Sequence, residues 1–275
     1  MDLIGKCAIV TGGSNGIGKA IAKLLARSGA NVFLIARTHE LLRIASEEVG
    51  REARNASQRF GFFSADVSDR AAVQGAVEAA EAECGPAAVL VNSAGFHRTG
   101  YVEKVPISDI EDEIRVNYLG TVYMVKQVLP GMMERREGWI QNISSLAGLK
   151  GIFGYAGYSG SKFAVMGFSE ALRSELRPYG VSVSALCPPD VDVERPEHYV
   201  EREQPIENSR VSEAAKPIQP EDVARAAVAG MKRGSFIIIP GSSGKLLHVV
   251  NRLAPWAVDM VLNRTIDRAR RERGL

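Results

Sequence analysis

Short apolar runs alternate along this chain with longer stretches in which apolar residues recur at helical spacing. Residues 6–12 read as a buried strand, and residues 16–28 place their apolar side chains on one helical face before Gly29, a plausible helix stop. The alternation then repeats to about residue 241. We expect strands near 6–12, 31–37, 58–66, 87–92, 138–144, 180–188 and 235–241. We expect helices near 16–28, 39–54, 69–83, 108–136, 157–177 and 220–232.

The strand segments are apolar without polar alternation, which is typical of strands covered on both faces. The pattern therefore predicts an α/β fold: a Rossmann-type, doubly wound, seven-stranded parallel sheet with helices on both faces. Two regions break the rhythm. Residues 189–218 are rich in Pro, Glu and Arg and are predicted to form a loop, and residues 242–275 are predicted to form a helical C-terminal extension.

Composition narrows the class of protein without identifying it. The chain has 275 residues, 45% of them apolar, which is enough to bury one large core. A net charge of +2 gives no argument for nucleic-acid binding. The three cysteines form no CxxC pair and the four histidines show no ligand spacing, so we expect no metal site and a reducing, cytoplasmic location. We see no secretion signal and no apolar run of about 18 residues.

The segment TGGSNGIG, residues 11–18, lies between the first strand and the first helix. Glycines there permit a tight turn and a close approach of the backbone to a pyrophosphate, whose charge faces the helix N-terminus. A simple strand-to-helix turn is the alternative interpretation. The residues expected to bind the cofactor in this loop are Gly12, Ser14, Asn15, Gly16, Ile17 and Gly18.

The ends of the next three strands complete the predicted cofactor site. Many NAD enzymes carry an acid at the end of the second strand, whereas this chain has Ala36 and Arg37. Because a guanidinium suits a 2′-phosphate, we favour NADP(H) over NAD(H); a merely solvated Arg37 is the alternative. The other residues expected at the cofactor are Asp66 and Val67 after the third strand, and Asn92, Ala94 and Gly95 at the fourth. Asn92 is also expected to tie neighbouring strands together.

A candidate proton-transfer group follows the fifth strand. Tyr158 and Lys162 lie one helical turn apart in YSGSK, and Ser145 precedes them at the strand end. A nearby cation is expected to lower the pKa of the phenol from its ordinary value of about 10. Tyr158 would then protonate a carbonyl oxygen that Ser145 hydrogen-bonds, while a nicotinamide supplies hydride. Packing for the tyrosine and solvation for the lysine are the alternatives for each residue alone.

Together, TGGSNGIG, NSAG, Asn117, Ser145 and YSGSK closely resemble the short-chain dehydrogenase/reductase family over roughly residues 5–241. The resemblance implies a catalytic set of Asn117, Ser145, Tyr158 and Lys162. It further implies that Asn117 belongs to a proton relay through Lys162 and that Lys162 and Tyr158 contact the nicotinamide ribose. Members usually assemble as homodimers or homotetramers through the helices near 108–136 and 157–177. Residues 1–241 are then the NADP-binding catalytic domain, with 189–218 as its substrate loop.

A finer resemblance is to the 3-ketodihydrosphingosine reductase branch, on the Pro188-Pro189-Asp190 sequence after the sixth strand. It implies that Pro188 and Val191 adjoin the nicotinamide carboxamide. It also implies NADPH-dependent reduction of a long-chain lipid ketone, similar to 3-ketosphinganine. One departure is Val193, where the branch usually has a threonine that meets the cofactor phosphates. The alternatives are another hydrophobic ketone, a steroid or an acyl thioester as substrate, or an NADP-binding sensor or scaffold without catalysis.

The remaining groups are predicted to have no catalytic role. We expect Asp109, Glu111, Asp112 and Glu113 to form a solvated helix face, and His97 to lie at the surface, with the mouth of the site as its alternative. Residues 244–275 carry apolar stripes, a tryptophan and a basic end, but each half is too short to span a bilayer. We favour packing against protein for this extension, with peripheral membrane contact as the alternative.

Overall fold

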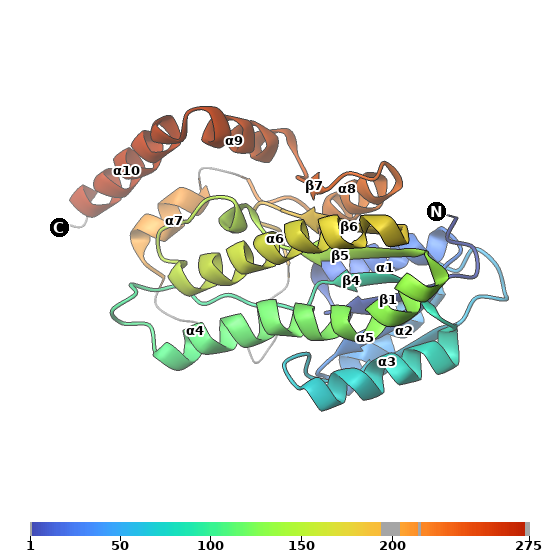
Figure 1. Cartoon of the computed structure of the whole chain (residues 1–275). Helices are drawn as coiled ribbons and strands as arrows, with labels where there is room; N and C mark the ends of the chain where they lie inside the picture. Colours follow the sequence, from blue (N-terminus) through green and yellow to red (C-terminus); the bar gives the residue numbers. More distant parts are fainter. Residues whose placement is uncertain (1, 194–203, 214–215, 273–275) are drawn as a thin grey trace.

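The computed structural model describes residues 2–193, 204–213 and 216–272, and it contains a parallel sheet sandwiched between helices (Figure 1). The sheet is seven-stranded, with the order β3-β2-β1-β4-β5-β6-β7 and parallel pairing throughout, so the predicted fold class is confirmed. The strands are β1 (Cys7–Thr11), β2 (Asn31–Ala36), β3 (Phe60–Ser64), β4 (Ala87–Asn92), β5 (Gly138–Ile143), β6 (Val181–Leu186) and β7 (Ile237–Ile238).

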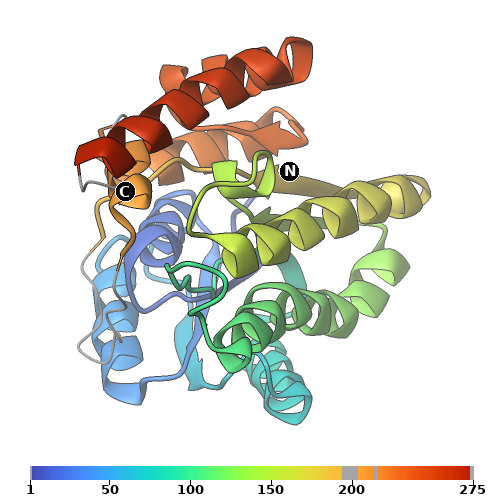
Figure 2. The ribbon, with the colours of Figure 1, turned by 90° about the vertical axis from the view of Figure 1, so that its left-hand side faces the viewer.

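Helices cover both faces of the sheet (Figure 2). One face is covered by α1 (Gly16–Arg27), α2 (His39–Gly50) and α8 (Pro220–Lys232). The other is covered by α3 (Arg70–Cys84), α5 (Gly120–Arg135) and α6 (Ala156–Leu176). The described helices beyond these layers are α4 (Ile107–Glu113), α7 (Ile206–Glu213), α9 (Ser242–Leu253) and α10 (Pro255–Glu272).

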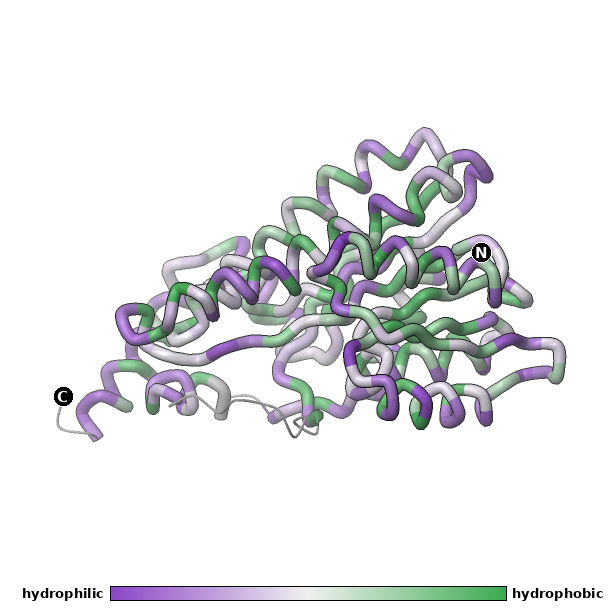
Figure 3. The backbone as a smooth tube through the Cα atoms, turned by 90° about the horizontal axis from the view of Figure 1, so that it is seen from below, coloured by the Kyte–Doolittle hydropathy of each residue, from purple (hydrophilic) through white to green (hydrophobic). Residues whose placement is uncertain are grey.

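The strand sequences explain this layering. Successive side chains point to opposite faces, so Ala8 and Val10 of β1 join the core under α1, while Cys7 and Ile9 join the core under α3 and α5. Every residue of β1, β4 and β5 is buried, as expected for strands covered on both sides. The sheet therefore runs through the molecule as a band of hydrophobic residues (Figure 3).

Three predicted elements differ from the structure. The expected last strand, 235–241, is reduced to Ile237–Ile238. The expected helix 108–136 is divided by a π-helical segment, Ile114–Leu119, between α4 and α5. The region 189–218 was predicted to be a loop, but Ile206–Glu213 forms α7. This helix is only weakly amphipathic, so its sequence pattern did not indicate a helix. Residues 194–203 and 214–215 of that region lie outside the described residues.

The C-terminal extension forms two helices that pack on the rest of the chain. Helix α10 contacts α7, and its Val258 and Ala269 are buried. Asn251 of α9 donates to the carbonyl of Leu149 at 3.2 Å, and Lys150 pairs with Asp259. Through these contacts, the side of the extension that faces the rest of the chain packs against protein, as expected. Among residues 2–193, 204–213 and 216–272, no helix is both long enough and apolar enough to cross a membrane.

Candidate active site at the carboxyl edge of the sheet

The predicted site residues gather at one edge of the sheet. In a parallel sheet all strands end at the same edge, and Thr11, Ala36, Asn92, Ile143 and Leu186 are the last residues of β1, β2, β4, β5 and β6. Open α/β sheets bind ligands in the crevice outside these carboxyl ends. Motifs that are far apart in the sequence therefore lie close together in space because of the sheet topology.

The glycine loop is packed too closely for side chains. Gly12 has φ = 63°, and a Cβ there would lie 2.8 Å from the backbone nitrogen of Ala94. A Cβ on Gly18 would collide with the carbonyl oxygen of Gly12. Thr11 Oγ1 accepts from the backbone N–H groups of Ser93 and Ala94, both at 3.1 Å. These contacts join β1 to the segment after β4 and leave bare backbone where a pyrophosphate would approach.

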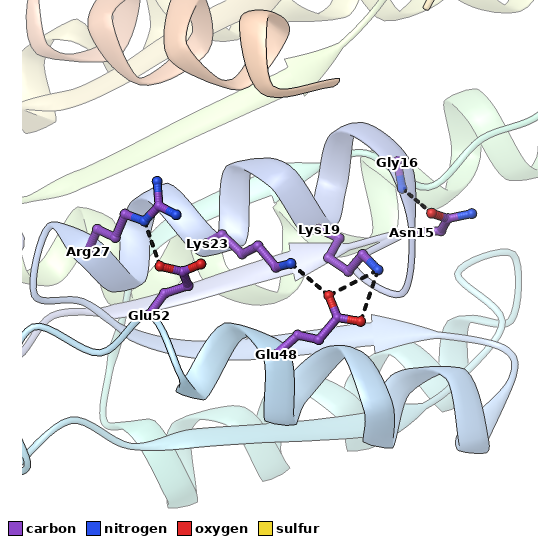
Figure 4. A network of polar contacts seen from close by, with 7 residues as sticks. All are labelled: Asn15, Gly16, Lys19, Lys23, Arg27, Glu48 and Glu52. Atoms are coloured by element: carbon purple, nitrogen blue, oxygen red, sulfur yellow. Dashed lines mark hydrogen bonds and ion pairs between the residues drawn. The ribbon is translucent and has the colours of Figure 1, made fainter. Parts of the chain in front are cut away.

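Helix α1 is capped at this loop and held firmly behind it. Asn15 Oδ1 accepts from the backbone N–H of Gly16 at 2.7 Å, so the helix begins as predicted. On α1, Lys19 and Lys23 both pair with Glu48 of α2, at 3.3 and 2.6 Å (Figure 4). Arg27 pairs with Glu52 at 2.7 Å (Figure 4). The N-terminus of α1 therefore faces the crevice from a fixed position.

The neighbouring strand ends place the other predicted cofactor residues. Arg37 is exposed directly after β2, and its carbonyl accepts from Ser64 Oγ at 2.7 Å. Asp66 accepts from both the backbone N–H and the hydroxyl of Ser68, at 2.8 and 2.7 Å, while Val67 is buried against Gly120. Asn92 Nδ2 donates to Asn142 Oδ1 at 2.9 Å, which confirms that Asn92 ties β4 to β5.

Asn117 lies in the π-helical segment and connects three parts of the site. Its Oδ1 accepts from the backbone N–H of Phe96 at 2.9 Å, and its Nδ2 donates to the Phe96 carbonyl and to Ser161 Oγ, both at 2.9 Å. A Cβ on Gly95 would lie 2.8 Å from Asn117 Oδ1 and 3.3 Å from Lys162 Nζ. Asn117 and Lys162 therefore converge on Gly95. Single-turn π-helical bulges are frequent at functional sites.

Ser145, Tyr158 and Lys162 are brought together as predicted. Ser145 caps a short 3₁₀ helix, Leu146–Gly148, and its hydroxyl hydrogen-bonds the Tyr158 side chain. Lys162 is buried, donates to the Ile143 carbonyl at 2.9 Å, and places Nζ 5.7 Å from the Tyr158 ring centre. The tyrosine and lysine thus lie on one side of α6, facing the end of β5.

The charge states differ from the expectation for the phenol. Burial raises the pKa of Tyr158 to about 12, and the Ser145 hydrogen bond opposes that rise. Burial also lowers the pKa of Lys162 to about 8. The predicted lowering of the Tyr158 pKa is therefore wrong in this structure, because desolvation of the phenolate by burial is the largest influence on that pKa. At neutral pH Tyr158 is a protonated donor and Lys162 is mainly cationic.

The segment after β6 lies beside the glycine loop. The Pro188 carbonyl accepts from the backbone N–H of Leu146 at 3.0 Å, and Val191 pairs with Ile218 as an isolated parallel bridge. A Cβ on Gly16 would lie 3.1 Å from Val193 Cγ1. Val193 therefore lies beside the loop expected to hold the phosphates, but its side chain offers no hydrogen bond there.

Two residues, Glu113 and His97, lie elsewhere than predicted from the sequence. Glu113 was expected on a solvated face, but its side chain is buried, and its carboxylate accepts from the backbone N–H of Arg98 at 2.6 Å. His97 was expected at the surface, but its ring is half-buried and lies 5.5 Å from the ring of Tyr158 and 5.3 Å from that of Tyr155. Glu113 lies four residues before Asn117, and residues at this spacing share one face of a helix. This spacing is the sequence signal that could have placed Glu113 beside the site.

A polar cluster joins the C-terminal extension to the rim of the site. Glu207 of α7 is buried and accepts from Arg270 Nε of α10 at 3.0 Å and from the Tyr101 hydroxyl at 2.9 Å. The Arg270 guanidinium lies 5.7 Å from the ring centre of Phe153, whose carbonyl accepts from Asn208 Nδ2 at 2.7 Å. Helices α7 and α10 are thereby fixed to the segment that connects Ser145 with Tyr158. We call Glu207, Arg270, Tyr101 and Phe153 the rim cluster.

The described residues include no group of His, Cys, Asp or Glu able to hold a metal ion. They do fit a dinucleotide: bare backbone at Gly12 and Gly18, a capped helix N-terminus at Gly16, and a Gly95 against which Asn117 and Lys162 pack closely. The Gly12, Gly16, Ala94 and Lys162 positions would hold the phosphates and the nicotinamide half. These residues lie at the same carboxyl edge of the sheet.

Comparisons with known proteins agree with this geometry. Residues 6–204 match the family model described as short chain dehydrogenase. The chain is 39% identical to a 3-ketodihydrosphingosine reductase of Bos taurus over 249 residues, covering 90% of this chain and 74% of the relative. It is also 39% identical to a 3-dehydrosphinganine reductase of Danio rerio over 252 residues, covering 91% and 75%.

Two solved structures have the same fold. A variant of actinorhodin polyketide ketoreductase with NADPH superposes with a TM-score of 0.73 at 31% identity, covering 86% of this chain and 96% of that one. A short chain dehydrogenase/reductase from Burkholderia phymatum in complex with NAD has a TM-score of 0.80 at 25% identity, covering 92% and 94%.

Proposed function

This chain belongs to the short-chain dehydrogenase/reductase family, and we propose that it reduces the carbonyl of a long-chain lipid, such as 3-ketodihydrosphingosine, with NADPH. The family makes it an oxidoreductase that uses a nicotinamide cofactor. The observation that supports the reaction best is the convergence of Asn117, Ser145, Tyr158 and Lys162 at the carboxyl edge of the sheet. Residues 1–241 are the proposed catalytic domain, and 242–275 an extension that packs on its rim.

Each of the four residues has a distinct role in this proposal. A bound nicotinamide cofactor supplies the hydride that reduces the carbonyl carbon. Tyr158 holds the proton that the carbonyl oxygen receives, and Ser145 orients that oxygen by a hydrogen bond. Lys162 supplies a positive charge beside the phenol, which favours release of the proton. Asn117 fixes the backbone of Phe96 and the hydroxyl of Ser161, so the loop after β4 and the start of α6 keep their spacing.

The charge states favour the reductive direction. A phenol with its pKa raised to about 12 is protonated at neutral pH, so it holds the proton that the oxygen of a reduced carbonyl requires. The reverse reaction would need the phenolate to accept a proton, and burial disfavours that form. The protonation state of Tyr158 near pH 7 is therefore the one that carbonyl reduction requires.

The choice of NADPH rests on the end of β2. Arg37 is exposed there, after Ala36, and no carboxylate occupies the position from which an acid would bind the ribose hydroxyls. A guanidinium offers planar donors that match a phosphate. A 2′-phosphate is thus better accommodated than two free hydroxyls.

The proposed lipid substrate rests on the similar proteins from Bos taurus and Danio rerio, which are named as reductases of 3-keto sphingoid bases. The polyketide ketoreductase neighbour favours a second candidate, a ketone carried on an acyl thioester. Both substrates present a carbonyl flanked by an apolar chain. They differ in the group beside the carbonyl, an amino alcohol in one and a thioester in the other.

The test is oxidation of NADPH by purified protein with 3-ketodihydrosphingosine, a 3-ketoacyl thioester and a short ketone, each at matched concentrations. We expect the highest kcat/KM with the sphingoid ketone. Tyr158→Phe should bind NADPH as the wild type does and lose at least about a thousandfold in kcat. A higher kcat/KM with the thioester would transfer the proposal to that substrate. NADPH binding without turnover of any ketone would indicate a sensor or scaffold instead.

A further inference from the structure

Glu113 is a buried carboxylate that the proposed reaction does not use. Its side chain is 1% exposed, at the end of α4 and directly before the π-helical segment. One carboxylate oxygen accepts from the backbone N–H of Arg98 at 2.6 Å. The other lies so close to Gly157 that a Cβ on this residue would collide with it. Glu113 thus contacts the residue immediately before Tyr158.

Glu113 and Asn117 form two adjacent connections between the same pair of segments. Asn117 links Phe96 to Ser161, and Glu113 links Arg98 to Gly157. Each residue therefore spans from the loop after β4 to the first turns of α6, one connection on either side of Tyr158. The contact of Glu113 with Gly157 is one of close packing in the first turn of α6, whereas Asn117 is hydrogen-bonded to Ser161.

Charged groups on the loop after β4, on α4 and on α6 act on this carboxylate. Arg98 approaches from the loop after β4, Asp109 from the same helix, and Lys162 from α6, where Tyr158 also feels its charge. Burial raises the pKa of Glu113 to about 7; the Arg98 backbone N–H and charge and the Lys162 charge oppose the rise, and Asp109 adds to it. The carboxylate consequently changes its charge within the neutral pH range.

We propose that Glu113 is a positioning residue for Tyr158 and Lys162: its carboxylate fixes the start of α6, and its negative charge keeps both of these groups protonated. The inference rests on the proposed reductase activity, which needs a protonated phenol and a cationic lysine. Glu113 itself does not touch the reacting atoms. A neutral side chain of the same shape would preserve the connection and remove the charge.

The sign of the effect follows from Coulomb's law. An anion near Tyr158 disfavours the phenolate, and an anion near Lys162 favours the ammonium, so it raises both pKa values. Removing the charge should lower both values. Activity that requires both protons should then be lost at lower pH. Below about pH 6 the wild-type Glu113 is itself neutral, so the two proteins should behave alike there.

The test is the pH profile of kcat/KM for ketone reduction in Glu113→Gln, with Glu111→Gln as the matched control. Glu111 is on the same helix, 53% exposed, and paired with Arg115 at 3.5 Å. We expect the alkaline limb of Glu113→Gln to move to lower pH by about half a unit or more, and the profiles to converge below about pH 6. Glu111→Gln should retain the wild-type profile.

A merely structural role would lower kcat/KM by the same factor at every pH, and an unshifted alkaline limb would overturn the inference. A second measurement needs no turnover. The infrared C=O band of a protonated acid, present in the wild type and absent from Glu113→Gln, should titrate near pH 7. Titration near the ordinary value of about 4.3 would also overturn the inference. A band near pH 7 in a protein that reduces no ketone would refute the proposed function alone.

Discussion

The rim cluster predicts a local destabilisation when Arg270 loses its guanidinium. Arg270→Met keeps an unbranched apolar stem of similar length and removes both the bond to Glu207 at 3.0 Å and the contact with the Phe153 ring. Glu207 is 1% exposed on its side chain, so its carboxylate would be left buried with Tyr101 as its remaining side-chain partner among the described contacts. A buried charge that loses its partner is a costly state.

The size of the effect can be bounded from the geometry. Removing one partner of a fully buried ion pair costs about 3–5 kcal/mol. The Arg270 side chain is 48% exposed, and Tyr101 still donates to Glu207, so the cost should lie below that range. A hydrogen bond to a charged group contributes about 1.5–3 kcal/mol, and we take about 2 kcal/mol, equivalent to roughly a 30-fold change in a local opening equilibrium.

Hydrogen exchange measured by mass spectrometry tests this number where it should appear. Helices α7 and α10 pack on each other at the rim, outside the two buried cores of the sheet, so their amides should exchange roughly 30-fold faster in Arg270→Met. Amides of β1 and β4 should be unaffected. The control is Arg268→Met, because the Arg268 side chain is 83% exposed and its ion pair with Glu272 is long, at 3.7 Å. Unchanged exchange in α7, or an equal change in the control, would refute the claim that the Arg270–Glu207 pair fastens the extension.

Three further predictions concern the cofactor and the buried acid. Arg37→Asp should weaken NADPH binding at least about tenfold more than NADH binding, because an anion replaces the cation proposed to face the 2′-phosphate; equal losses in fluorescence titrations would contradict this. Val193→Thr should tighten NADPH binding by roughly 3- to 10-fold, since Val193 lies beside Gly16 and a hydroxyl there adds one hydrogen bond to a phosphate; Val193→Ala is the control. Glu113→Gln should gain thermal stability relative to wild type between about pH 5 and about pH 8. Between the ordinary pKa of a glutamate and about 7, Glu113 is protonated in the folded wild type and ionised in the unfolded chain. The free energy of unfolding of the wild type therefore falls by up to about 3 kcal/mol across that pH range, and that of Glu113→Gln does not. Parallel dependences of melting temperature on pH in the two proteins would contradict this.

The parts of the fold that follow local rules were predictable from the sequence. Fully apolar runs such as Ala87–Asn92 indicate strands covered on both faces, and the alternation of strands with amphipathic helices fixes a parallel sheet. Strand ends of a parallel sheet share one edge, so the glycine loop, Asn92 and Ser145 had to meet. Helix α7 was missed because its sequence, IENSRVSE, has no apolar stripe; it is helical because it packs against α10.

The charge state of the site could not be read from the order of residues. The spacing of Tyr158 and Lys162 indicates proximity, and proximity to a cation alone predicts a lower phenol pKa. In the structure, burial of the phenol raises its pKa instead, and burial is a property of the whole packed neighbourhood. Desolvation lowers the pKa of Lys162, because burial disfavours the ammonium as it disfavours the phenolate of Tyr158. Burial therefore favours the neutral form of both side chains.

Glu113 shows why an acidic helix face is a weak guide to exposure. Four of the seven residues from 107 to 113 are acidic, and an α-helix could leave all of them in solvent. The π-helical turn that follows rotates the chain by about one residue relative to an α-helix, so a single stripe runs from Glu113 through Asn117 into the site. The local backbone irregularity thus places a carboxylate and an amide side by side, on Gly157 and Ser161, and each supports one side of the tyrosine. A charge buried at such a position is costly, and the backbone N–H of Arg98 and the cations of Arg98 and Lys162 offset part of that cost.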